Sequence, residues 1–354
     1  MNYYKELDGL RFFAILLVII HHWLPKNHLF NFSPNGAIGV TIFFVLSGFL
    51  ISSILFGYKD KINVGKLTLS RALRIFFIRR SLRIFPIYYI LIGFLFFYGY
   101  DAITQNIFYF LTYTSNILFF EKQSFFGTVT HLWTLAVEEQ YYLIWPFLLF
   151  LISNKYIRLV IISLIFFSII SQFIMKKDFF YYELLTFNAF DAFGIGSLLA
   201  YYKNYKISKI IKLRNFLWIF SSAFIILSTI NYQIFSTRTI TSVFTGLLIL
   251  YVIDERYSGS FLNKILSIKP VMFIGKISYG MYLFHPFIHG LMDSVYNRLP
   301  LDNQNIFYPA FIFLTSFGVL IIISSISWFL IESPINSLKN KFQILDSRNK
   351  PAIV

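Results

Sequence analysis

The sequence contains no cysteine and few charged residues. Without cysteine among its 354 residues, the chain can form no disulfide, no thiolate nucleophile and no cysteine-ligated metal site. Its six histidines lack the spacing of a zinc site. Charged residues make up 13% of the chain, against about 25% in an average soluble domain. Hydrophobic residues make up 57% and the mean hydropathy is +0.66. These values predict a membrane protein with no metal site.

Apolar runs long enough to cross a bilayer, about 17 to 25 residues each, recur along the whole chain. They lie at 8–28, 37–57, 84–100, 131–152, 157–175, 185–202, 215–234, 239–254, 271–294 and 307–331. The run 106–120 is shorter and is interrupted by Thr, Ser and Asn, so we expect a re-entrant or surface segment on the outer side. The sequence therefore predicts an all-α, polytopic integral membrane protein with about ten transmembrane helices.

The basic residues predict the orientation of these helices. If the N-terminus is cytoplasmic, all but six of the 31 lysines and arginines fall on the cytoplasmic side, the six being Lys26, Lys122, Lys176, Lys177, Arg238 and Arg298. This asymmetry is the positive-inside pattern. It places both termini of the multi-pass protein in the cytoplasm. The net charge of +15 is then a topology signal, and no nucleic-acid partner is expected. We expect one transmembrane domain, 1–340, and a short cytoplasmic tail, 341–354.

The first apolar run carries ionisable residues at both ends. On a helix, Arg11 and His22 are separated by roughly 16 Å along the axis and lie within about 20° of the same face. Asp8, three residues before Arg11, can hold the guanidinium in one pose, whereas His21 is rotated off this face. Ionisable groups at bilayer depth are functional-site candidates, so His22, Arg11 and Asp8 are candidate catalytic residues. The alternative is a hydrogen-bonded core histidine and an arginine that only sets orientation.

A second cluster follows in the stretch "RIFFIRRSLRIFPIYY". Arg80 and Arg83 are three residues apart at the predicted cytoplasmic end of the third helix. Two guanidiniums on one face suit a polyphosphate or a carboxylate. We treat them as candidate ligand-binding residues, with ordinary positive-inside flanking as the alternative.

A third cluster is "HLWTLAVEEQYYLIWP". His131 and Glu138 are seven residues apart, so they share a helix face at about 10 Å along the axis. A carboxyl group buried in a membrane holds its proton more readily, which suits proton transfer near neutral pH. We expect Glu139 and Gln140 to face elsewhere. The alternative for His131 and Glu138 is structural capping at the outer interface.

Three weaker signals complete the set of polar positions. "GKISYGMYLFHP" places Ser278, Tyr279, Tyr282 and His285 on the ninth predicted helix, and "IESP" places Glu332 at the cytoplasmic end of the tenth. Both are compatible with polar helix packing. Gly48 and Ser52 form a small-residue pair that predicts close helix packing.

Together these stretches resemble the membrane-bound acyltransferase family 3, which contains bacterial glycan O-acetyltransferases. The similarity lies in "LDGLR" with an arginine and a histidine eleven residues apart, "GVTIFFVLSGFLI", "RRSLRIFPIYY", "HLWTLAVEEQYYL" and "SYGMYLFHP", in the family's order. It covers residues 5–335. Thr134 and Tyr141 stand where serine and phenylalanine are common in the family.

The resemblance implies a membrane-embedded O-acyltransferase that takes an acyl group, usually acetyl, from cytoplasmic acyl-CoA and passes it to a sugar hydroxyl at or beyond the outer face. Arg80 and Arg83 would grip the CoA phosphates. His22 would act as general base or as transient acyl carrier. Glu138 would activate the acceptor hydroxyl or organise the site together with His131. No permanently bound cofactor is implied, because acetyl-CoA or another acyl-CoA is a substrate.

The expected partners are acyl-CoA, a glycan or lipid-linked saccharide acceptor, and membrane lipids. Lipopolysaccharide, capsule, exopolysaccharide, a nodulation-type oligosaccharide and peptidoglycan precursors all remain open as acceptors. Some family members carry an appended extracytoplasmic hydrolase-like domain, which is not expected in these residues, so a second transfer step would use a separate extracytoplasmic protein. The rival interpretation is a transporter or flippase for a lipid-linked sugar or small solute. It predicts related halves, and we find no internal repeat.

Overall fold

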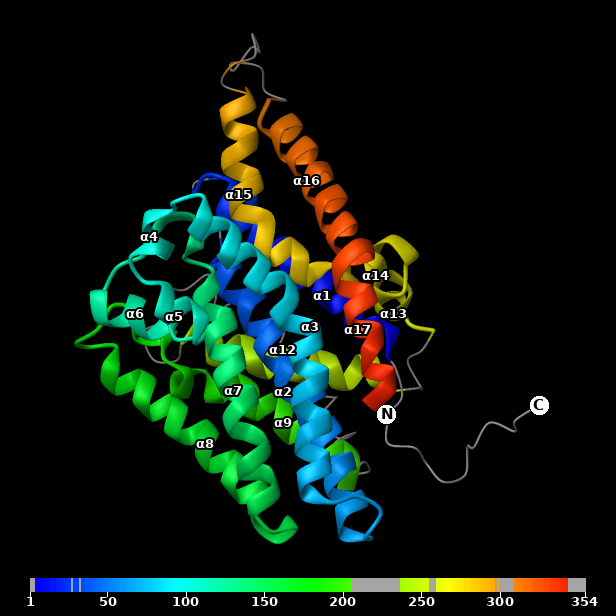
Figure 1. Ribbon diagram of the computed structural model, residues 1–354. Coiled ribbons are helices and arrows are strands. Elements are labelled where there is room, and N and C mark those ends of the chain that lie inside the picture. The colour runs from blue at the N-terminus through cyan, green and yellow to red at the C-terminus, as the bar shows by residue number, and fades with distance from the viewer. Residues whose placement is uncertain are drawn as a thin grey trace.

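The computed structural model describes residues 4–26, 28–31, 33–205, 236–254, 259–296, 298 and 308–342. These residues are helical or in turns, and they contain no β-strand (Figure 1). The predicted span 215–234 and the tail beyond residue 342 lie outside the described residues.

The helices are of very different lengths. They are α1 (Lys5–Trp23), α2 (Asn35–Asn63), α3 (Leu69–Phe97), α4 (Asp101–Thr104), α5 (Ile107–Leu111), α6 (Ser115–Lys122), α7 (Leu132–Leu151), α8 (Asn154–Met175), α9 (Phe190–Tyr205), α12 (Thr237–Ile253), α13 (Phe261–Leu266), α14 (Lys269–Lys276), α15 (Ser278–Tyr296), α16 (Tyr308–Ser327) and α17 (Ser333–Ser337). Short 3₁₀ turns lie at Leu29–Asn31, Gly127–Val129, Tyr182–Leu184, Thr186–Ala189 and Leu338–Phe342, and a π-helical turn, Trp328–Glu332, joins α16 to α17.

Among the described residues, four helices are long and apolar enough to cross a membrane, namely Asn35–Asn63, Leu69–Phe97, Asn154–Met175 and the continuous Pro309–Ser337. α8 and α16, on opposite sides of the molecule in Figure 1, expose large apolar side chains to the outside, among them Leu159, Phe166, Phe173, Leu314 and Ile322. Soluble monomers rarely carry such extended apolar surfaces. The chain is therefore a membrane protein, while the total number of spans and their orientation stay predictions.

α1 and α7 are nearly as long as the four candidate spans, but they carry the ionisable residues of the predicted site. α1 contains Asp8 and Arg11, and α7 contains Glu138 and Glu139. Such residues lower the hydropathy of a helix and at bilayer depth mark functional positions.

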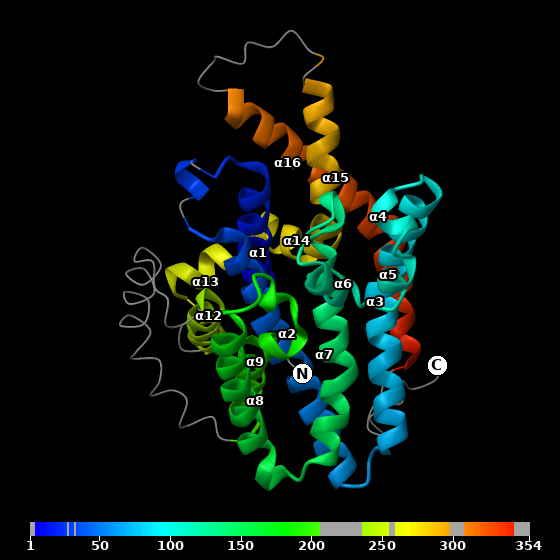
Figure 2. The same cartoon turned by 90° about the vertical axis from the view of Figure 1, so that its left-hand side faces the viewer.

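The run 106–120, which we expected to be a re-entrant or surface segment, does not form a single helix. α5 and α6 are short and separated by a turn, and α3 and α7 on either side run in opposite directions in both views (Figures 1 and 2). The Tyr88 hydroxyl donates to the Phe110 carbonyl at 2.8 Å and the Tyr89 hydroxyl to the Leu111 carbonyl at 2.9 Å. α5 is thereby fixed against α3, and the chain returns to α7 without crossing the molecule.

Two predicted boundaries are wrong. The third predicted span starts at residue 84, but α3 starts at Leu69, after Thr68, whose side chain accepts a hydrogen bond from the Arg71 N–H. A hydropathy criterion detects the apolar part of this helix and misses its basic first half. Arg80 and Arg83 therefore lie in the middle of α3, and the prediction that they stand at its cytoplasmic end is wrong.

The predicted ninth span, 271–294, is also not one helix. It divides at Ile277 into α14 and α15. The break lets α14 pack directly on α1, where a Cβ added at Gly275 would lie only 1.8 Å from the Asp8 carbonyl oxygen. Only glycine permits this approach.

α2 and α9 also pack through small residues, as the Gly48 and Ser52 pair predicted. A Cβ at Gly48 would lie 2.2 Å from the Phe193 carbonyl oxygen, and a Cβ at Gly196 would lie 2.2 Å from that of Val45. One turn from Gly48, the Ser52 hydroxyl donates to Ser197 Oγ at 2.8 Å. Close backbone contact and an interhelical hydrogen bond are the usual means of packing helices in lipid. This contact fixes the face of α2 that carries Ser47.

Lys59, one of the basic residues expected on the cytoplasmic side, is buried and caps the end of α7. Its ammonium group donates to the Leu149 carbonyl at 2.6 Å and to the Ile152 carbonyl. We expect Lys59→Met to lower the free energy of unfolding by about 1–3 kcal/mol, because two carbonyls at a helix C-terminus lose a cationic donor. Thermal unfolding in detergent checks this, with exposed Lys66→Met as the control. Equal midpoints for the two variants would contradict the assignment.

Candidate active site

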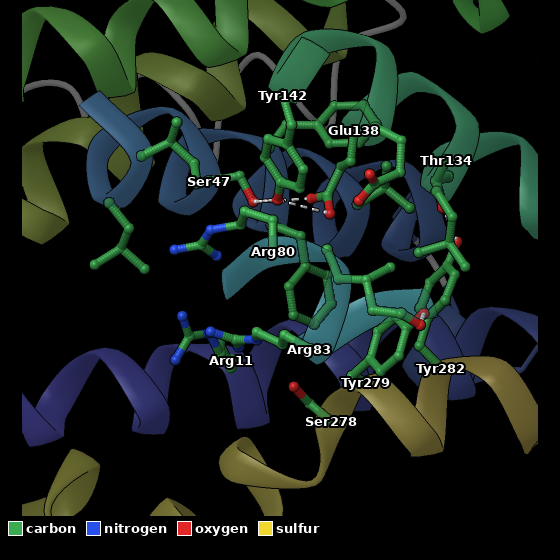
Figure 3. Close-up of a pocket in the computed structure, with 18 residues that line it drawn as sticks. Arg11, Ser47, Arg80, Arg83, Thr134, Glu138, Tyr142, Ser278, Tyr279 and Tyr282 are labelled. Carbon is green, nitrogen blue, oxygen red and sulfur yellow. Dashed lines mark hydrogen bonds between the residues drawn. The ribbon is translucent and has the colours of Figure 1, made fainter. Parts of the chain in front are cut away.

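A cavity of about 100 Å³ lies between α1, α2, α3, α7 and α15 (Figure 3). We call it the arginine cavity. Its polar lining consists of Arg11, Ser47, Arg80, Arg83, Thr134, Glu138, Glu139, Tyr142, Ser278, Tyr279 and Tyr282. Residues from five helices that are far apart in sequence therefore converge on one small volume.

The three arginines differ in how they are held. Arg11 Nη1 lies 2.5 Å from Asp8 Oδ1, which is the pairing expected from the sequence. The Arg80 guanidinium lies 5.9 Å from the centre of the Tyr142 ring, a cation–π distance, and Arg83 is exposed. Within the described residues neither Arg80 nor Arg83 makes a hydrogen bond or an ion pair. Two guanidiniums that line a cavity without partners provide free donors for an anionic ligand.

Two hydroxyl groups fix Glu138, one from Ser47 of α2 and one from Tyr142 of α7. Ser47 Oγ donates to Glu138 Oε1 at 2.9 Å, and the Tyr142 hydroxyl lies 3.2 Å from Glu138 Oε2 and 3.0 Å from Ser47 Oγ. Figure 3 shows this group above the Arg80 side chain, with Arg11 and Arg83 below. The carboxylate thus holds Tyr142 in place beside Arg80.

The prediction that Glu139 faces elsewhere is wrong. Glu139 lines the arginine cavity, and its Oε1 is buried with no hydrogen-bond partner. Gln140 does point away, as predicted, and donates to the Tyr113 carbonyl and to Asn116 Oδ1, both at 2.8 Å. On a helix, adjacent residues are about 100° apart, so a cavity that is wide enough can contact both Glu138 and Glu139.

Glu138 and His131 do not form one site. The sequence placed both on the outer half of the protein, apart from the arginine pair, whereas the structure puts Glu138 in the cavity with Arg80 and Arg83 and leaves His131 outside it. The reason is the longer α3, which brings its arginines up to the level of Glu138.

Close backbone contacts position the start of α1. A Cβ at Gly9 would lie 2.4 Å from the Leu266 carbonyl oxygen, at the end of α13, and Gly275 of α14 meets the Asp8 backbone. The "LDGLR" stretch thus needs glycine at its centre so that α1 can pack on α13 and α14. This packing holds the Asp8 and Arg11 pair at the wall of the cavity.

At the other end of α1, three imidazoles form what we call the histidine cluster: His22, His131 and His285. The ring centres of His22 and His285 are 4.9 Å apart, and those of His131 and His285 are 5.2 Å apart. His285 is fully buried, whereas His22 is exposed. Arg11 and His22 do not touch, so His285, and not Arg11, orients His22. No group of three or more His, Asp or Glu side chains in the described parts of the chain has a metal-binding arrangement.

The hydrogen bonds of the cluster fix its tautomers. His285 Nδ1 lies 2.8 Å from the Tyr282 carbonyl oxygen, and a ring nitrogen must carry a proton to bond to a carbonyl. In a neutral His285, Nε2 is then the acceptor, and it lies 3.0 Å from His22 Nδ1. We therefore assign the proton of His22 to Nδ1, donated to His285. The lone pair of His22 sits on Nε2.

His131 has no free nitrogen. Its Nδ1 lies 2.9 Å from the Thr128 carbonyl oxygen and its Nε2 lies 3.2 Å from that of Leu283. Both nitrogens face acceptors, and a neutral ring can donate to only one of them. His131 therefore lacks a lone pair directed at a substrate, and its position suits a structural tie between α7 and α15.

Tyr282 connects the arginine cavity to the histidine cluster. Its hydroxyl lines the cavity, accepts from Thr134 Oγ1 at 2.7 Å and donates to the His131 carbonyl at 3.2 Å, while its own carbonyl holds His285. Tyr282 and His285 were not predicted from the sequence to have a functional role. The signal was present, because two polar residues at i and i+3 share one face of α15.

The chain matches the acyltransferase domain family over residues 4–328. It is 29% identical over 98% of its length to a peptidoglycan O-acetyltransferase of Listeria monocytogenes, covering 58% of that protein. It is 31% identical over 95% of its length to a putative peptidoglycan O-acetyltransferase of Bacillus subtilis, covering 55% of it. A putative O-acetyltransferase of Staphylococcus aureus is 29% identical over 94% of the chain, which covers 57% of that relative.

The chain thus spans little more than half the length of these relatives. No solved structure matches it. Since the family match covers nearly the whole chain, the chain belongs to the acyltransferase family that its sequence motifs indicated.

Proposed function

We propose that the protein is a multi-pass O-acetyltransferase of the bacterial cytoplasmic membrane, which moves an acetyl group from cytoplasmic acetyl-CoA to a hydroxyl of a cell-envelope glycan. One observation carries this proposal. A cavity with unpaired guanidiniums is joined through Tyr282 to a histidine whose lone pair is free and exposed. The family match and the names of the relatives agree with it.

The arginine cavity is the proposed donor site. Guanidinium groups bind phosphate through paired, charge-assisted hydrogen bonds, and the nucleotide part of CoA carries several phosphates. Arg80 and Arg83 are free to make such bonds. Glu138 keeps Tyr142 beside Arg80, so its proposed role is to position the donor site and not to activate the acceptor.

The reacting thioester would extend from this cavity toward His22. Arg11 and His22 are roughly 16 Å apart along α1, a distance that suits the long, narrow pantetheine arm of CoA. The phosphates would then remain near the arginines while the acetyl group reaches the histidine cluster. Under the predicted orientation, this movement runs from the cytoplasmic side toward the outer side.

At His22 the chemistry is acyl transfer with general-base catalysis. The acceptor oxygen attacks the thioester carbonyl carbon, a C–O bond forms, and the acceptor proton passes to His22 Nε2. The C–S bond then breaks, and the proton passes from His22 to the sulfur, which yields free CoA and the O-acetyl ester. His285 accepts the hydrogen bond from His22 Nδ1 throughout, so it keeps the base in the right tautomer.

The proposed acceptor class is an N-acetylhexosamine glycan, because the relatives from Listeria and Bacillus are named for peptidoglycan. The test is CoA release by protein purified into proteoliposomes with acetyl-CoA, with and without a chito-oligosaccharide. We expect release that depends on the acceptor and O-acetylated sugar as product. Uptake of sugar without acetylation would favour the transporter interpretation. If the protein shows neither acetylation nor uptake, the proposal is wrong.

Substitution of His285 tests the tautomer assignment. We expect His285→Leu to reduce kcat about a hundredfold, because His22 Nδ1 loses its acceptor and the ring is free to take the other tautomer. His285→Gln can place an amide oxygen near the same point and should recover at least a tenth of wild-type kcat. The KM for acetyl-CoA should change little in both. Equal activity of the Leu and Gln variants would show that His285 acts only through packing.

A further inference from the structure

A second cavity, of about 270 Å³, lies where the end of α1 meets α15 and α16. We call it the outer cavity, because the predicted orientation puts it on the outer side. Its wall includes Trp23, His289, Asp293, Pro309, Phe313 and Ser316. None of these residues lines the arginine cavity. Figure 2 shows α15 and α16 diverging at this end of the molecule.

Two polar atoms of residues that line the outer cavity have no hydrogen-bond partner. His289 stacks on Trp23 with ring centres 5.5 Å apart and planes 17° apart, and its Nε2 lies 3.6 Å from Asp293 Oδ2. Its Nδ1 is buried with no hydrogen-bond partner, and so is Oγ of Ser316, a residue only 1% exposed. Buried polar atoms are nearly always hydrogen-bonded in native proteins. The two orphan atoms therefore point to a ligand with its own hydrogen-bonding groups.

The rest of the wall is apolar. Pro309, Ile312, Phe313 and Ser316 follow the i, i+3, i+4, i+7 spacing of one helix face, so α16 presents three apolar residues and one hydroxyl to the cavity. A saccharide has the matching chemistry, because a pyranose ring combines apolar C–H faces with hydroxyl edges. A lipid tail would leave His289 Nδ1 and the Ser316 hydroxyl without partners.

The outer cavity adjoins the proposed base. His285 and His289 are one turn apart on α15, and they contact consecutive residues of α1: His285 bonds to His22, and His289 stacks on Trp23. Trp23 Nε1 also donates to the His285 carbonyl at 3.1 Å. A ligand in the outer cavity would therefore lie beside His22, on the side of the histidine cluster away from the arginine cavity.

We propose that the outer cavity binds the saccharide acceptor, with Asp293, His289 and Ser316 bonding to its hydroxyls while a further hydroxyl reaches His22 Nε2. The role of the saccharide as acceptor rests on the proposed function. The position of its binding site rests on the cavity and on the two polar atoms without partners. The two substrates then approach His22 from opposite ends of α1. Neither has to pass through the site of the other.

Binding without turnover tests the location separately from the reaction. The probe is chitotetraose, followed by saturation-transfer difference NMR with the full-length protein in nanodiscs and no acetyl-CoA. We expect a transfer signal with the wild type and a loss of affinity of about tenfold in the double variant Asp293→Asn, Ser316→Ala, which removes hydrogen bonds to two hydroxyls. The control is the double variant Asp178→Asn, Ser294→Ala, which changes the same residue types outside the cavity.

Kinetics supply the second readout. In the cavity variant the KM for chitotetraose should rise about tenfold, while the KM for acetyl-CoA stays within about twofold of the wild type. Unchanged affinity in the cavity variant, or no transfer signal with the wild type, would overturn the assignment. The wild type could bind the saccharide, and the cavity variant could bind it more weakly, although the protein releases no CoA. That result would support the binding site and contradict only the proposed reaction. Thermal unfolding of the cavity variant identifies any loss that comes from misfolding.

Discussion

The variant His22→Ala is expected to lose at least a hundredfold in kcat for acetyl transfer while it binds CoA with an affinity within about twofold of the wild type. The loss follows from the removal of a general base, which contributes roughly 10²- to 10⁴-fold. The unchanged affinity follows from distance, because His22 lies at the far end of α1 from the arginine cavity. CoA release and calorimetric titration with CoA measure the two quantities.

The adjacent histidine is a close control. His21 is also near the end of α1, but its ring lies against Gly36 of α2, where a Cβ would be 2.6 Å from the imidazole, and it makes no hydrogen bond to His285. His21→Ala should keep kcat within a few-fold of the wild type. Equal losses in the two variants would show that this end of α1 acts through structure and not through the lone pair of His22.

A labelling experiment with the wild-type protein distinguishes the two possible roles of His22, general base and acyl carrier. A general base never holds the acetyl group, so incubation with labelled acetyl-CoA and no acceptor should leave the protein unlabelled. An acetyl group found on His22 by mass spectrometry would show the carrier role, in which a neutral imidazole attacks the thioester directly. The free Nε2 of His22 suits either reaction chemically, so this experiment decides between them.

Helix positions were largely predictable from the sequence, because a membrane-spanning helix requires a long apolar run, and such runs are visible in the sequence. Helix ends were not. α3 extends through a basic stretch that hydropathy excludes, and the predicted ninth span divides at Ile277 because Gly275 packs on the backbone of α1. The first error comes from charged residues within one helix, which a hydropathy criterion rejects. The second comes from a contact between helices, which the hydropathy of one segment does not contain.

The sequence identified candidate residues one by one, but it did not show how they group in space. The pairing of Asp8 with Arg11 follows from spacing along one helix, and it was predicted. The bond between His22 and His285 joins residues 263 positions apart, so no local pattern reveals it. For the same reason the sequence grouped Glu138 with His131, its neighbour on α7, and not with the arginines of α3.

The double variant Arg80→Gln, Arg83→Gln is expected to raise the KM for acetyl-CoA about a hundredfold or more and to change kcat little. Each guanidinium makes charge-assisted bonds to phosphate, worth about 1.5–3 kcal/mol per bond, and a hundredfold loss corresponds to about 2.8 kcal/mol. The matched control is Arg71→Gln, Arg74→Gln, a pair with the same spacing in the first turns of α3 and exposed to solvent. It should leave both constants near wild type.

The donor itself provides the sharper comparison. Acetyl-pantetheine carries the same thioester without the nucleotide phosphates, so its KM should be the same in the wild type and in the Arg80, Arg83 variant. If the KM of the variant rises equally for acetyl-CoA and for acetyl-pantetheine, the arginines do not bind the phosphates. Stability is not expected to interfere, because within the described residues neither side chain makes a hydrogen bond or an ion pair that its removal would break. A lysine pair at the same positions should recover only part of the affinity, since an ammonium group keeps the charge but not the bidentate geometry.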